Sequence, residues 1–272
     1  MAPLGLGGGF YGLGPTINAG EAVHVNDEDG NYLVVPTGTS GTEAANGVVV
    51  SNGFQSTFRG SFTFSTYFYG GNEQDTTKTY SHLFSTRKNS QNYFEIIVTS
   101  PFKVFISHEA NNDQSLPTTG SNAAGLDGTA TGWHHMLCTV TKNSSANTSY
   151  KLYIDGSEIS LTNEAALSDT NHALYEEDDE ITIGNRYDRD GNRRAWLLKH
   201  TALWSVALDA NNIAEIYGAG INTPLDLTSA SGDYDQQGNL VGYWKFTDGA
   251  GTTAVDTTGN NNGTVTGNAT LI

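Results

Sequence analysis

The ten residues SFTFSTYFYG, positions 61–70, alternate strictly between two kinds of side chain. Phenylalanines occupy one set of alternate positions and hydroxyl-bearing residues the other: Phe62, Phe64 and Phe68 against Thr63, Ser65 and Tyr67. Successive side chains of a β-strand point to opposite sides, so this pattern predicts a strand with one apolar face. Such a face must be buried against a second layer, which favours a layered β-sheet protein.

Similar short segments follow and predict further strands at residues 80–87, 92–100, 102–107, 132–142, 151–159, 180–184 and 195–204. Glycine supplies 32 of the 272 residues and charged residues only 15%, a composition typical of many short strands joined by turns. Asp155-Gly156 predicts a type I′ hairpin turn, because both residues tolerate positive φ. One helix is predicted over 209–218, with Asp209 as its N-cap and Gly218 as its stop.

The segment GWHHMLCTVTK, residues 132–142, holds a tryptophan, two adjacent histidines and the only cysteine of the chain. It could form a catalytic or metal site, or it could be a core strand. Met136, Cys138 and Val140 alternate with more polar neighbours, as in a core strand. His134 and His135 would then point to opposite faces and could not bind one metal ion together. We therefore interpret the segment, beginning with Trp133, as a core strand.

The polar stretch at 109–131 shows no strand pattern, and a loop of this length in a compact domain is usually functional or mobile. The net charge of −16 argues against nucleic-acid binding, which needs clustered lysine and arginine. No window approaches the length of an apolar membrane span, so membrane insertion is not expected.

Several motifs together resemble the laminin G-like, concanavalin A-like jelly-roll family. They are the Trp-His-His strand, the hairpin LYIDG at 152–156, the Ile-Gly strand end at 183–184, and the segment ALWSVALD at 202–209 that leads into a helix ending in Tyr-Gly. The resemblance covers roughly residues 45–222. It implies an all-β jelly-roll sandwich of two antiparallel sheets with one short helix.

The tail resembles the opening strand of the same module, through NLVGYWKFTDGAG at residues 239–251. Too few residues remain for a second module, so we expect 239–272 to return to the same sandwich as closing strands. The predicted organisation is a glycine-rich arm at 1–20 and a single domain at 21–272.

This combination of family and glycine-rich start resembles bacteriophage virion proteins. The resemblance implies a non-catalytic structural or binding protein on the virion surface, as capsid decoration or with the tail or fibre; an extracellular or cell-surface location is the alternative. Expected partners are other virion proteins or further copies, through the arm, and host cell-surface glycans on the lectin-like sandwich.

A glycan-cleaving enzyme is the alternative function, because glucanases share this fold. Those enzymes resemble one another in a Glu-x-Asp-x-x-Glu strand that carries the catalytic carboxylates. Here Glu176 and Asp178 are followed by Ile181 at the third position, so the motif is incomplete. The sequence therefore favours a binding protein.

The turn RYDRDGNRR at 186–194 is the candidate binding site. It combines a ring, carboxylates, an amide and a guanidinium that suit a polar ligand: Tyr187, Asp188, Asp190, Asn192 and Arg194. Asp188 and Asp190 are also candidate calcium ligands, since oxygen atoms at alternate positions suit a hard cation. The same Asp-x-Asp-Gly-Asn pattern occurs at 27–31, and ordinary turn chemistry accounts for both copies as well.

Overall fold

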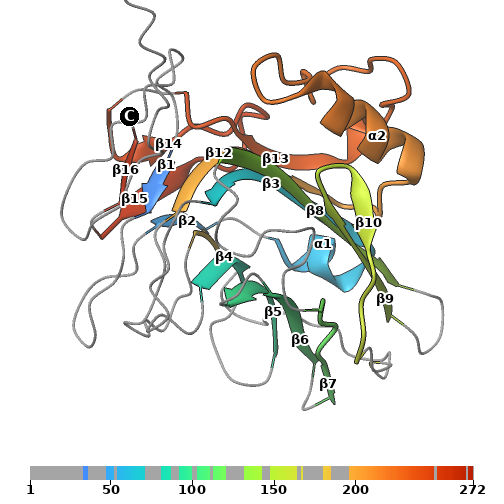
Figure 1. Cartoon of the computed structure of the whole chain (residues 1–272). Coiled ribbons are helices and arrows are strands. Elements are labelled where there is room, and N and C mark those ends of the chain that lie inside the picture. The colour runs from blue at the N-terminus through green and yellow to red at the C-terminus, as the bar shows by residue number, and fades with distance from the viewer. Residues whose placement is uncertain are drawn as a thin grey trace, which may run out of the picture.

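In a computed structural model, the chain forms two antiparallel β-sheets packed face to face (Figure 1). The structure describes residues 33–35, 47–51, 54–70, 81–86, 92–99, 103–110, 113–120, 132–142, 148–163, 167, 180–184, 196–247, 250–267 and 269–271. The predicted fold class, an all-β sandwich of two antiparallel sheets, is confirmed. The predicted arm at 1–20 lies outside the described residues.

Within the described residues, sheet A has eight strands, with β13 as a second partner at one end of β12. In spatial order they are β10 (Ser157–Ile159), β9 (Thr148–Ile154), β8 (Gly132–Lys142), β3 (Phe62–Gly70), β12 (Trp196–Trp204), β1 (Leu33–Val35) and β16 (Thr270–Leu271), with β13 (Leu240–Trp244) beside β12. The hairpin turn between β9 and β10 has φ of 48° at Asp155 and 73° at Gly156, which confirms the predicted turn.

Sheet B also has eight strands in the part of the chain that the structure describes. In spatial order they are β14 (Thr253–Ala254), β15 (Gly263–Thr266), β2 (Gly47–Ser51), β11 (Glu180–Ile183), β4 (Ser81–Ser85), β5 (Asn92–Thr99), β6 (Lys103–Ala110) and β7 (Asp113–Ser115). Strands from the 239–272 segment occur in both sheets, because β13 and β16 join sheet A while β14 and β15 join sheet B.

The main core lies between the two sheets, where the phenylalanines of β3 are fully buried. The ring centroid of Phe62 is 4.8 Å from that of Phe94, and Phe64 is 4.5 Å from Phe84, both on sheet B. Burial of each such side chain contributes roughly 1.5–3 kcal/mol. The phenylalanines of residues 61–70 therefore lie on the inner face of sheet A, as their alternation predicted.

The interpretation of residues 132–142 as a core strand is confirmed for residues 135–140, which are buried. Met136, Cys138 and Val140 belong to the main core, and burial raises the pKa of the Cys138 thiol. Trp133, in contrast, is only partly buried and packs edge-on against Tyr69. The prediction was wrong for this residue, because Trp133 lies on the outer face of sheet A, beside Tyr69 and Lys199, and not on the face that packs against sheet B.

A second core lies on the outer face of sheet A, under helix α2 (Ala210–Ala219) (Figure 1). It consists of Leu137, Tyr153, Ala202, Trp204, Leu208, Ile213, Ile216, Leu227, Tyr234 and Tyr243. The turn η3 (Gln237–Asn239) leads from this layer into β13. The sequence did not predict the one-turn helix α1 (Gln55–Arg59), which lies at one end of the main core with Phe58 packed on Phe62.

The predicted N-cap of α2 is confirmed, since the side chain of Asp209 accepts a hydrogen bond from the backbone N–H of Asn212 at 2.9 Å. The predicted stop was wrong: Gly218 lies inside the helix, and the helix ends at Gly220, which has φ of 76°. Of two glycines spaced two apart, the one that adopts positive φ ends the helix.

One prediction about a loop was also wrong. The stretch 109–131 includes β7, and Thr118 bridges to both Phe105 and Thr162, because backbone pairing needs no apolar alternation. The strands that precede and follow residues 186–194 lie in different sheets, β11 in sheet B and β12 in sheet A. The predicted turn itself lies outside the described residues. Among the described residues, no helix is both long and apolar enough to cross a membrane.

Candidate functional site

The site is built on a β-bulge in β12. The register between β12 and β3 shifts between Lys199 and Ala202, so His200 and Thr201 together face the single residue Thr66. His200 has φ of 49°, in the left-handed region, which histidine tolerates better than a β-branched residue does. The bulge places Lys199 and His200 side by side on one face, where regular alternation would separate them.

A tyrosine from the neighbouring strand holds the imidazole of His200. Tyr243 on β13 makes a hydrogen bond of 3.1 Å between its Oη and His200 Nδ1. Both side chains are nearly buried, with 9% of His200 and 1% of Tyr243 exposed. The bond uses one ring nitrogen and leaves Nε2 for another partner.

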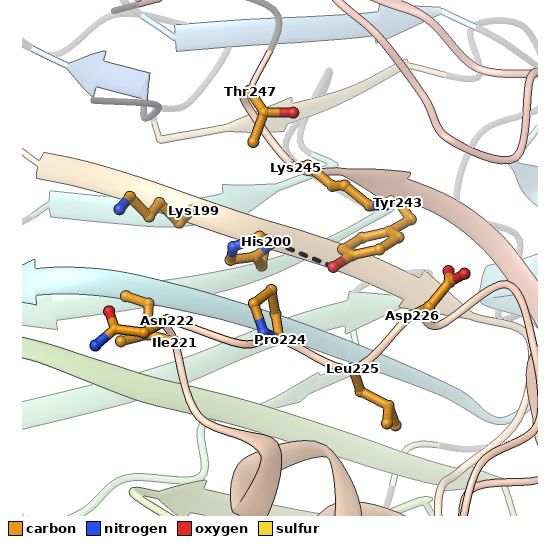
Figure 2. Close-up of a pocket in the computed structure, with 10 residues that line it drawn as sticks. All are labelled: Lys199, His200, Ile221, Asn222, Pro224, Leu225, Asp226, Tyr243, Lys245 and Thr247. Carbon is orange, nitrogen blue, oxygen red and sulfur yellow. Dashed lines mark hydrogen bonds between the residues drawn. The ribbon is translucent and has the colours of Figure 1, made fainter. Parts of the chain in front are cut away.

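A pocket of about 590 Å³ lies over this pair (Figure 2). This volume falls in the range of about 300–1,000 Å³ that small-molecule sites occupy. The lining comes from β12, from the segment that follows α2 and from β13 with the residues after it: Lys199, His200, Ile221, Asn222, Pro224, Leu225, Asp226, Tyr243, Lys245 and Thr247. The pocket thus combines an aromatic ring, an apolar wall, charged groups, an amide and a hydroxyl.

The electrostatics of the pocket keep its histidine neutral. Burial, and then the positive charges of Lys199 and Lys245, lower the pKa of His200 to about 4. Burial also raises the pKa of Tyr243, so its phenol keeps its proton at neutral pH. The two lysines are therefore the cationic groups of this lining at neutral pH.

Asp226 is the carboxylate of the pocket. Its Oδ1 accepts hydrogen bonds from the hydroxyl of Thr228 at 2.7 Å and from the backbone N–H of Thr228 at 3.1 Å. These bonds, with a smaller contribution from Lys245, hold the pKa of Asp226 below its ordinary value. The carboxylate is exposed and ionised at neutral pH, so it can accept hydrogen bonds from a ligand.

A second polar cluster lies near the pocket on the outer face of sheet A. It has some of the features of a catalytic nucleophile paired with its general base. Ser65 Oγ lies 2.7 Å from His135 Nε2. Asp155, however, bonds the ring of His134 and the backbone N–H of His135, not the imidazole of His135. Burial lowers the pKa of His135 to about 4, and Ser65 and His135 are 2% and 1% exposed. Asp155 therefore does not orient the imidazole of His135 as the carboxylate of a catalytic triad would, and a substrate cannot reach the buried Ser65 hydroxyl. The cluster is structural.

The same contacts confirm that the two adjacent histidines face opposite sides. His134 packs against Phe68 of the main core, while the ring of His135 stacks on Tyr217 of α2 at 6.0 Å. They cannot bind one metal ion together. In the part of the chain that the structure describes, no group of three His, Cys, Asp or Glu side chains could hold a metal.

The binding site predicted from sequence lies outside the described residues. This applies to every one of its members, namely Tyr187, Asp188, Asp190, Asn192 and Arg194, and to Glu176 and Asp178. Calcium binding by Asp188 and Asp190 therefore stays a prediction. The sequence reasoning missed the pocket at His200, although one signal was present: two polar residues, Lys199 and His200, interrupt the apolar run of β12.

A family model described as the concanavalin A-like lectin/glucanases superfamily matches residues 40–214. That range includes β12 with its bulge and ends within α2, so the match covers most of the sandwich. No curated protein matches the chain significantly.

Solved structures with a similar fold share little sequence with this chain. The binding domain of botulinum neurotoxin serotype D/C is 15% identical with a TM-score of 0.46, and the match covers 63% of this chain and 40% of that one. A heptameric SAP-like pentraxin from Limulus polyphemus is 12% identical with a TM-score of 0.42, covering 72% and 86%. The CBM40 of the Ruminococcus gnavus IT-sialidase is 12% identical with a TM-score of 0.40, covering 66% and 97%. The chain thus spans about two fifths of the toxin domain's length.

Proposed function

The chain belongs to the concanavalin A-like lectin/glucanase superfamily, and from this membership we propose that it is a non-catalytic module that binds glycans. The observation that carries the proposal is the pocket over His200 and Tyr243. Sugars present hydroxyl groups around a ring with apolar faces, so their sites need hydrogen-bonding groups beside apolar and aromatic surface. Asn222, Asp226 and Thr247 supply the former, and Pro224 with its neighbours supplies the latter.

The composition of the pocket favours binding over cleavage. Glycoside hydrolysis generally uses two carboxyl groups on either side of the scissile bond. The lining of the pocket contains one carboxylate, Asp226, among the residues that the structure describes. His200, with its pKa near 4, is a weak base at neutral pH. A binding site needs neither a second carboxylate nor a basic imidazole.

We further propose that the module acts on the surface of a bacteriophage particle, as capsid decoration or with the tail or fibre. Support comes from the sequence resemblance and from the glycine-rich segment 1–20, through which the protein would contact other virion proteins or further copies. The neighbouring genes test this placement. A position among capsid or tail genes supports it, and a position in a metabolic operon contradicts it.

A glycan array tests the binding function. We expect the wild-type protein to bind a subset of glycans, and the double variant Asn222→Ala/Thr247→Ala to lose about tenfold in affinity or more, since each polar contact to a ligand contributes about 0.5–1.5 kcal/mol. Both residues are exposed, so the variant should fold normally. Asn211→Ala, an equally exposed change on α2 away from the pocket, is the matched control.

An array that stays silent at high protein density would contradict glycan binding and favour a purely structural role. Release of sugar products from a bound glycan would contradict the non-catalytic assignment.

A further inference from the structure

The hydrogen bond between Tyr243 and His200 determines which nitrogen of the imidazole carries the proton. The Tyr243 side chain is 1% exposed, and His200 Nδ1 is the hydrogen-bond partner of its hydroxyl. If Nδ1 carried the imidazole proton, the buried phenol proton would lack an acceptor in the described part of the chain, which is unfavourable. The hydroxyl is therefore the donor to Nδ1, and the neutral imidazole carries its proton on Nε2.

The Nε2–H group of His200 is a neutral donor that opens into the pocket. Nε2 has no hydrogen-bond partner among the described residues, yet it is not fully enclosed by protein, in contrast to Nδ1 of His135. The two nitrogens of an imidazole point to different sides of the ring, so Nε2 is directed away from Tyr243. Figure 2 shows Ile221 and Asn222 on that side of the imidazole. The donor therefore faces the wall formed by the segment after α2.

The apolar surface of this wall is aliphatic. Ile221 and Pro224 are both partly exposed. The phenol ring of Tyr243, in contrast, is buried, and Lys245 Nζ lies 5.3 Å from its ring centroid. It offers no open face on which a sugar ring could stack. Aliphatic side chains beside a polar group suit a methyl substituent of a sugar better than the broad face of its ring.

The amide of Asn222 supplies a hydrogen-bond acceptor next to the aliphatic surface. Its side chain is exposed and forms no hydrogen bond within the described part of the chain. One side of the pocket thus combines the neutral donor of His200, the neutral acceptor Oδ1 of Asn222 and an aliphatic wall. An acetamido group presents the complementary set, because it has a carbonyl oxygen, an N–H and a methyl group.

We propose, resting on the glycan-binding function above, that the pocket recognises an N-acetylated amino sugar through its acetamido group. The carbonyl oxygen accepts a hydrogen bond from Nε2–H of His200, and the amide N–H donates to Oδ1 of Asn222. The methyl group packs against Ile221 and Pro224. Hydroxyl groups of the sugar ring donate to the exposed carboxylate of Asp226, on the other side of the imidazole (Figure 2).

Matched pairs of probes that differ only in the acetamido group test this proposal. One pair is triacetylchitotriose and cellotriose, and a second is methyl N-acetyl-α-galactosaminide and methyl α-galactoside. Isothermal titration should show at least one acetylated probe binding about tenfold more tightly than its unacetylated counterpart, since a hydrogen bond and a buried methyl group are lost without the substituent. The pair that discriminates identifies the configuration of the sugar.

Two variants of Asn222 test the location. Asn222→Asp and Asn222→Leu both remove the amide donor, but aspartate keeps an oxygen acceptor and leucine does not. Affinity for the acetylated probe should stay within about threefold of wild type in Asn222→Asp and fall about tenfold in Asn222→Leu. Affinity for the unacetylated counterpart should change by less than about twofold in both. Asn211→Leu, an equally exposed change on α2, is the matched control.

Long-range ¹H–¹⁵N NMR tests the role of the imidazole independently of affinity. The His200 signals, identified by their loss in His200→Asn, should show a protonated Nε2 and an unprotonated Nδ1 at neutral pH. The Nε2 signal should shift when the acetylated probe is added and stay in place with the unacetylated one. A protonated Nδ1, or an Nε2 signal that ignores the acetylated probe, would overturn His200 as the donor.

Equal affinity for both members of each pair, in a protein that binds other glycans on the array, would overturn acetamido recognition and leave glycan binding intact. A preference for the acetylated probe that survives in Asn222→Leu would overturn this side of the pocket as its site. Absence of binding to any glycan, on the array and in solution, would overturn the proposed function itself.

Discussion

The outer face of sheet A has two halves that are formed by the same strands and serve different purposes. Under α2, the cross-strand row of Ala202, Ser65 and Leu137 and the adjacent Trp204 are sealed by the helix. One row further along, Lys199, Tyr67 and His135 replace the apolar residues. The first half is a core and the second adjoins a pocket, although the backbone is one continuous sheet.

The bulge in β12 marks the boundary between the two halves. Because His200 and Thr201 face one residue of β3, the strand resumes with Ala202 facing the second core and Leu203 facing the main core. Tyr217, at the end of α2, stacks on His135 and closes the covered half. The part of the face that α2 covers must be apolar because it is buried. The part that α2 leaves uncovered can carry polar groups for a ligand.

The largest expected effect is on stability, from a truncation in the covered half. Ile213→Ala removes a side chain that is 1% exposed between α2 and sheet A. We expect the free energy of unfolding to fall by about 2–5 kcal/mol, as for other large-to-small core changes. Urea unfolding measures it, with Asn222→Ala in the pocket half expected to stay within about 0.5 kcal/mol of wild type. Similar losses in both variants would show that the pocket half is as structural as the covered half.

A smaller effect is expected from the histidine at the boundary. The pKa of His200 is about 4 in the folded protein, below the ordinary value of 6.5, so between these values the unfolded chain binds more protons. Stability should therefore fall as the pH falls through this window. Lys199 and Lys245 raise the cost of protonation, and Tyr243 contacts the same ring.

The variant His200→Asn removes this proton site and suits the positive φ of the bulge. Between pH 7 and pH 5, we expect wild type to lose about 2 kcal/mol more unfolding free energy than the variant. His135 titrates in both proteins and cancels in the difference. Parallel pH profiles would mean that His200 is not held neutral by its surroundings.

The covered half could be predicted from the sequence far better than the pocket half. Alternation identified the inner faces of β3 and β8, and Asp209 identified the start of α2, because burial and capping leave local patterns. The pocket depends on Tyr243, which is more than forty residues from His200 in sequence and adjacent to it in space. No local pattern encodes that contact. A break in alternation at Lys199 and His200 marks the bulge, but only the pairing with β13 turns the bulge into a site.

The smallest expected effect concerns the cap of α2. Asp209 Oδ1 accepts hydrogen bonds from both the backbone N–H and the side-chain Nδ2 of Asn212, at 2.9 and 2.8 Å. Asp209→Ala leaves those donors without this acceptor, and loss of an N-cap costs about 1 kcal/mol. Asp209→Asn keeps an oxygen at the same place and should cost much less. Thermal unfolding of the wild type and both variants measures this order, and a loss in the asparagine variant equal to that in the alanine variant would assign the effect to charge instead of capping.

If the two halves of the face are independent, neither Asp209 variant changes affinity for the glycan that the wild type binds. A parallel fall in affinity would show that α2 positions the pocket wall at Asn222 and Asp226.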